Sequence, residues 1–113
     1  MIRIAVLDDH PAVLAGLERL VSREDDLDPV AVVEAQEELW TRLDGSGADV
    51  VVVDYDLSRG DGLAVCTRLK DRARPPRVVV YSAYAGPALA IGAGVAGADG
   101  LVSKSEPVAA LLS

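Results

Sequence analysis

Four consecutive valines, Val50–Val53, constrain the fold of this chain more than any other segment. Successive residues of a strand point to opposite faces of a sheet, so a run of this kind is apolar on both faces. Sheets that are buried on both faces are typical of parallel α/β proteins, in which helices connect the strands. The composition agrees, because hydrophobic residues make up 50% of the chain and aromatic residues only 4%. We therefore expect a core built from aliphatic side chains around a parallel sheet.

The rest of the chain alternates between short β-branched runs and segments with helical periodicity. Five strands that alternate with helices predict one α/β domain with right-handed crossovers, and 113 residues suffice for a single domain. The expected strands cover residues 2–7, 30–33, 50–53, 77–81 and 101–103. In chain order, the expected helices begin at Pro11, cover 37–43, begin near Gly60–Gly62, cover 87–96 and start again over 106–113. Pro75-Pro76 is expected to stop the helix that begins near Gly60–Gly62.

Charge, cysteine content and hydropathy exclude several classes of protein. The 18 acidic and 11 basic residues give a net charge of -7, which is the wrong sign for a chain that itself binds duplex DNA. One cysteine, Cys66, cannot form an intramolecular disulfide framework. The sequence has no apolar run long enough for a membrane helix and no signal-peptide layout at its N-terminus. We expect a cytoplasmic protein without membrane contact.

Polar residues follow the predicted strands at the points where the strands end. Asp8 and Asp9 come after the first strand, Asp54 after the third, Ser82 after the fourth and Lys104 after the fifth. Ligands of open α/β sheets bind outside the carboxyl ends of the strands. The sequence therefore predicts that these five side chains converge on one site.

The charges of this site favour a divalent cation and phosphoryl chemistry. Three carboxylates and Lys104 leave a charge of about -2, which is costly without a counter-ion. Oxygen ligands, with no histidine or cysteine expected nearby, favour Mg²⁺. Asp54 is then placed to act as a nucleophile on a phosphoryl group whose oxygens are held by Mg²⁺, Lys104 and Ser82.

Four separated motifs resemble those of a known family. They are VLDDH at 6–10, VVVDYDLSRGDG at 51–62, VVVYSAY at 78–84 and GADGLVSKS at 97–105. In order and spacing they resemble the receiver domain of two-component response regulators of the NarL/FixJ, LuxR-type class, over essentially the whole chain. The resemblance implies a flavodoxin-like (βα)5 fold with a five-stranded parallel sheet of order 2-1-3-4-5 and an incomplete last helix.

The resemblance also implies a role for each residue of the site. Asp54 is the expected phosphoacceptor, which takes its phosphate from a sensor histidine kinase. Asp9 and Asp54 are expected to ligate Mg²⁺ directly, Asp8 mainly through water, and Asp56 through its backbone carbonyl. The resemblance implies that the phosphate contacts Ser82, as the switching hydroxyl, and Lys104, as the charge partner. The small side chain of Ala83 is expected to leave the phosphoacceptor accessible to the phosphate. Such a protein phosphorylates and dephosphorylates itself and is a switch rather than a turnover enzyme.

Three features depart from the family pattern. Leu101 stands where the family usually has Tyr or Phe, and Ser58 stands where it usually has Pro. The chain also ends nine residues after Lys104. From this we expect residues 1–113 to be a receiver truncated before a helix-turn-helix domain, through which alone it would contact DNA in regulating transcription. A second copy of the chain, in a homodimer, is a further candidate partner.

Two other functions are considered as alternatives. An atypical receiver would serve as an interaction module without phosphorylation, as the residues at 58 and 101 suggest. A haloacid-dehalogenase-like phosphatase would use the DYDLS segment at 54–58, with Asp56 as acid and base. In that family, however, the motif ends the first strand, and Asp8 and Asp9 would have no role.

The remaining distinctive residues have structural interpretations. His10, next to Pro11, is expected at a helix start, Cys66 in helix packing, and Trp40 as a partly exposed apolar cover. Asp56 either adds charge to the site or faces water. Residues 85–98 carry no charge, and their glycines predict a marginal, mobile helix with an exposed apolar side.

Overall fold

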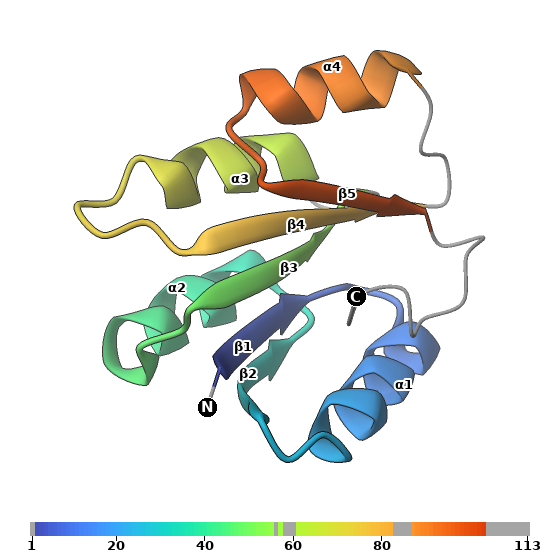
Figure 1. Ribbon diagram of the computed structural model, residues 1–113, viewed down its shortest axis with the longest axis vertical. Coiled ribbons are helices and arrows are strands. Elements are labelled where there is room, and N and C mark those ends of the chain that lie inside the picture. The colour runs from blue at the N-terminus through green and yellow to red at the C-terminus, as the bar shows by residue number, and fades with distance from the viewer. Residues whose placement is uncertain (1, 56, 58–60, 83–86, 104–113) are drawn as a thin grey trace.

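The chain forms a five-stranded parallel sheet with helices on both faces (Figure 1). The computed structural model describes residues 2–55, 57, 61–82 and 87–103. The strand order is β2-β1-β3-β4-β5, which confirms the predicted 2-1-3-4-5 arrangement. The predicted helix over 106–113 lies outside the described residues. The strands are β1 (Ile2–Leu7), β2 (Leu27–Val33), β3 (Val50–Asp54), β4 (Arg77–Ser82) and β5 (Gly100–Ser103), and the helices are α1 (Pro11–Ser22), α2 (Gln36–Ser46), α3 (Gly62–Lys70) and α4 (Pro87–Val95).

The buried valines of β3 contribute to two separate hydrophobic clusters. Val51 and Val53 belong to the cluster covered by α2 and α3, whereas Val52 belongs to the cluster covered by α1. Figure 1 shows α1 on one side of the sheet and α2 and α3 on the other. The prediction of a strand buried on both faces is confirmed. This double burial fixes the position of the residue that follows the valines, Asp54.

Two element boundaries differ from the predicted ones for identifiable reasons. β2 begins at Leu27 rather than at residue 30, and it includes Pro29. Proline is tolerated there because β2 is an edge strand, and the β1–β2 register shifts directly after the pair Ile4–Pro29. The prediction that Pro75-Pro76 stops α3 is wrong. This helix ends at Lys70, where the backbone N–H of Asp71 donates to the carbonyl of Thr67 and that of Arg72 donates to the carbonyl of Leu69.

Helix α4 places apolar side chains on its outer side. Ala93 is buried, whereas the side chains of Ile91 and Val95 are 70% and 85% exposed. The predicted exposed apolar side is therefore confirmed. Cys66 is buried in the core, as predicted, and Trp40 is half-buried with the Arg68 guanidinium 4.1 Å from its ring centroid.

Candidate metal and phosphoryl site

Three carboxylates meet at the carboxyl ends of β1 and β3. The two strands are neighbours, and Leu7 pairs with Val53, so Asp8 and Asp54 follow at the same level of the sheet. The backbone N–H of Asp8 donates to the carbonyl of Val33 at 3.2 Å, which ties the end of β1 to β2. Asp8 and Asp54 are each only 1% exposed, whereas the side chain of Asp9 is 17% exposed. These three carboxylates lie together at the strand ends, where the sequence placed them.

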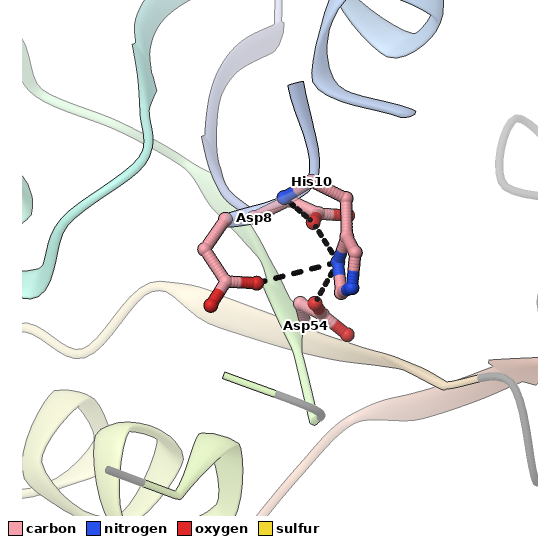
Figure 2. A group of neighbouring side chains, drawn as sticks. Asp8, His10 and Asp54 are labelled. Atoms are coloured by element: carbon pink, nitrogen blue, oxygen red, sulfur yellow. Dashed lines mark hydrogen bonds and ion pairs between the residues drawn. The ribbon is translucent and has the colours of Figure 1, made fainter. Parts of the chain in front are cut away.

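The imidazole of His10 lies between the carboxylates of Asp8 and Asp54 (Figure 2), and Asp9 belongs to the same group. Its Nδ1 is 2.9 Å from Oδ1 of Asp8, 3.1 Å from Oδ2 of Asp54 and 3.3 Å from Oδ1 of Asp9. One nitrogen atom is thus within ion-pair distance of all three carboxylates. The expectation that no histidine lies near the site is wrong.

The start of α1 explains why the ring of His10 reaches this position. His10 is the N-cap residue of α1, with extended backbone angles, and Pro11 opens the helix as predicted. The backbone N–H of His10 donates to Oδ1 of Asp8 at 2.8 Å, which closes a tight turn between the strand and the helix. This turn brings the ring back over the strand ends. The predicted helix-start position of His10 is confirmed, but the contact of its ring with the three carboxylates was not predicted.

Ser82 ends β4, the next strand of the sheet, and is fully buried. Asp54 pairs with Tyr81, so Ser82 lies one residue further along at the same edge. Leu101 is half-buried in β5, paired with Val80. The other predicted residues, Asp56, Ser58, Ala83 and Lys104, lie outside the described residues.

The donor atoms of this site suit a divalent cation. One atom from each of Asp8, Asp9, His10 and Asp54 can be chosen so that all four lie within 4.8 Å of one another. Carboxylate oxygens are the preferred ligands of hard cations such as Mg²⁺. Burial of two of these carboxylates makes their charge costly unless a cation offsets it. The residues present therefore fit the predicted metal.

Comparison with known proteins identifies the family. The sequence model of the response regulator receiver domain matches residues 4–113. The chain belongs to this family. The match does not support the phosphatase alternative, and Asp54 ends the third strand rather than the first.

Relatives of this receiver domain include regulators of the NarL/LuxR class. The DNA-binding transcriptional activator DevR/DosR of Mycobacterium tuberculosis is 31% identical over 104 residues, which are 92% of this chain and 48% of that protein. The transcriptional regulatory protein UhpA of Salmonella typhimurium is 34% identical over 104 residues, which are 92% of this chain and 52% of that protein. The receiver thus spans about half the length of these curated relatives.

Solved structures agree with this fold. A two-component response regulator of the LuxR family from Aurantimonas is 31% identical, with a TM-score of 0.88 over 97% of this chain and 79% of that chain. The receiver domain of a putative NarL from Mycobacterium tuberculosis is 28% identical, with a TM-score of 0.87 over 98% of this chain and 93% of that chain. Across the part of the receiver that the structure describes, no helix has the length and apolar character needed to cross a membrane.

Helix α3 of the receiver packs its first residue directly against the backbone of Asp54. A Cβ atom placed on Gly62 would lie 2.6 Å from the Cα of Tyr55 and closer still to the carbonyl oxygen of Asp54. The helix begins here because Oδ1 of Asp61 accepts a hydrogen bond from the N–H of Leu63 at 2.8 Å. Sequence reasoning placed a helix start near these residues but did not find this contact. Only glycine allows so close an approach.

Proposed function

We propose that Asp54 is the phosphoacceptor of this receiver, and that it takes its phosphoryl group from a phosphohistidine of a sensor histidine kinase. The observation that carries the proposal is the burial of Asp54 at the end of β3, in one group with the carboxylates of Asp8 and Asp9 that follow β1. An idle carboxylate next to four valines would be expensive to bury. A carboxylate that reacts there is held in place by the sheet.

The proposed reaction is an in-line phosphoryl transfer. A carboxylate oxygen of Asp54 attacks the phosphorus, the P–N bond to the kinase imidazole breaks, and an acyl phosphate forms. Mg²⁺, held by Asp8, Asp9, Asp54 and the backbone carbonyl of Asp56, would supply the positive charge that offsets the incoming phosphoryl oxygens. This chain would then only phosphorylate and dephosphorylate itself.

Two further residues are proposed to hold the phosphoryl oxygens. Ser82 follows the partner of Asp54 in β4, so its hydroxyl belongs to the same edge of the sheet. Lys104 directly follows Ser103, the last residue of β5, on the strand next to β4. A hydroxyl donor and an ammonium group are suited to a phosphoryl group that carries spread negative charge.

The proposed consequence of phosphorylation is a shift between two conformations that controls a transcriptional output. Relatives of this domain, such as the DNA-binding transcriptional activator DevR/DosR, support this regulatory role. With a net charge of -7, this chain would contact DNA only through a further domain, for which we propose a helix-turn-helix. Leu101 would have to relay the change without the usual aromatic ring. We place the switch, alone or as a homodimer, in the cytoplasm, where it would meet the kinase.

The test is the intact mass of the protein after incubation with Mg²⁺ and acetyl phosphate. We expect a gain of one phosphoryl group, and no gain for Asp54→Asn or in the presence of a chelator. Asp44→Asn is the matched control, because this exposed carboxylate pairs with Arg72 and should not affect the gain. If folded protein gains nothing from either acetyl phosphate or a histidine kinase, the atypical receiver becomes the better interpretation.

A further inference from the structure

The histidine among the carboxylates changes the chemical character of the metal site. Three oxygen donors alone form a hard site, whereas an added imidazole nitrogen is a borderline ligand typical of zinc, copper and nickel sites. We propose that His10 Nδ1 serves as a fourth ligand and makes this a site that binds Zn²⁺ more tightly than Mg²⁺. This inference rests on the proposed use of the carboxylates as metal ligands.

The distances around Nδ1 match those between ligands of a single cation. Donor atoms bound at about 2.1 Å lie about 3.0 Å apart in an octahedral shell and about 3.4 Å apart in a tetrahedral one. The three distances from Nδ1 to the carboxylate oxygens are 2.9, 3.1 and 3.3 Å, which are close to these values. All four donor atoms lie within 4.8 Å of one another, so one cation would be held by all of them once the ring of His10 moves outward and leaves room between its Nδ1 and the carboxylates.

The setting of His10 allows these movements without cost to the core. Its side chain is 51% exposed, and it lies at the N-cap of α1 rather than within the helix. Its backbone N–H meanwhile holds Oδ1 of Asp8 at 2.8 Å, so the same residue also orients one of the carboxylates. A ligand with this freedom can approach a small cation, and orientation of the neighbouring ligand raises affinity further.

The expected consequence is competition between the two ions. Divalent transition ions generally bind sites with nitrogen donors more tightly than Mg²⁺ does. Zn²⁺ at low concentration would therefore displace Mg²⁺ from the carboxylates.

The test compares the affinities of Zn²⁺ and Mg²⁺, measured by titration calorimetry, for the wild type and for His10→Ala. We expect the preference for Zn²⁺, expressed as the ratio of the two dissociation constants, to fall at least about tenfold in the variant. Even outer-shell partners of metal ligands are commonly worth 10- to 100-fold in affinity. Asp54→Asn is the matched control, since loss of a shared oxygen ligand should weaken both ions.

A second readout observes the ligand directly. His10 is the only histidine of the chain, so the imidazole nitrogen resonances in NMR arise from one ring. One equivalent of Zn²⁺ should shift the Nδ1 resonance strongly and the Nε2 resonance much less. An unchanged Nδ1 resonance at saturating Zn²⁺, or an unchanged ratio in His10→Ala, would overturn the proposal.

The phosphoacceptor role of Asp54 and the ligand role of His10 fail in distinguishable ways. If Mg²⁺ supports phosphorylation of Asp54 but Zn²⁺ binding is independent of His10, only the histidine ligand is refuted. If Zn²⁺ shifts Nδ1 but neither donor phosphorylates Asp54, the ligand role stands and the proposed function is refuted. If neither ion binds, both are refuted.

Discussion

Replacement of Gly62 by alanine tests whether α3 is held against the phosphoacceptor strand by close backbone contact. Carbon atoms are best separated by about 3.5 Å or more. The alanine Cβ would lie 2.6 Å from the Cα of Tyr55 and closer to the carbonyl oxygen of Asp54. The shortfall is about 0.9 Å for the carbon–carbon contact, and both neighbours are backbone atoms. These backbone atoms, of Asp54 at the end of β3 and of Tyr55 directly after it, cannot rotate away as a flexible side chain would.

The magnitude follows from the cost of overpacking. Extra methyl groups forced into well-packed sites typically cost about 1–3 kcal/mol, and backbone neighbours place Gly62→Ala near the upper end. We expect a loss of about 3 kcal/mol in the free energy of unfolding, a large share of the stability of a small domain. Because the displaced atoms carry Asp54, the phosphorylation rate with acetyl phosphate should fall as well.

Gly16→Ala is the matched control for this change. Gly16 lies in α1, and a Cβ placed there would meet nothing within 4 Å. Alanine should stabilise that helix by about 0.5–1 kcal/mol. Urea denaturation followed by circular dichroism measures both variants. A Gly62→Ala protein as stable as Gly16→Ala would refute the close contact between α3 and β3.

Three further predictions concern the rest of the domain. Leu39→Ala removes a fully buried side chain and should cost about 2–5 kcal/mol in urea denaturation, whereas Ile91→Ala, at a 70% exposed position, should change stability by less than about 0.5 kcal/mol. Hydrogen bonds from Lys70 and a backbone N–H lower the pKa of Asp99, so its contribution to stability is present at neutral pH and is lost as the pH falls through this lowered pKa. Asp99→Asn should therefore be less stable at neutral pH and lose less stability on acidification; an unaltered pH profile would contradict this. Burial raises the pKa of the Cys66 thiol, so a thiol reagent should label the native protein far more slowly than the unfolded one, and equal labelling rates would contradict the burial.

Much of the fold was predictable because the pattern of hydrophobic residues along the chain determines which segments form buried strands. Residues that follow buried β-branched runs must lie at strand ends, and this placed Asp8, Asp54 and Ser82 correctly. Boundaries were less predictable where a tertiary contact decides them. β2 extends back to Leu27 because Leu27 pairs with Ile2 of β1. α3 ends at Lys70, where backbone N–H groups cap the last turn and the Lys70 ammonium group donates to the carbonyl of Pro76 and to the carboxylate of Asp99.

The site depends on the strand order and on the conformation of a single turn, and only the strand order could be predicted from the sequence pattern. The carboxylates meet because β1 and β3 are neighbours in the sheet, so their convergence follows from the strand order alone. The position of His10 instead depends on a turn closed by one hydrogen bond and on the rotation of one side chain. A signal was present, since a histidine two residues after Asp8 shares the same turn. The fold therefore explains why this domain gathers carboxylates, whereas the preference among cations depends on a residue at the helix cap, which can change without altering the sheet.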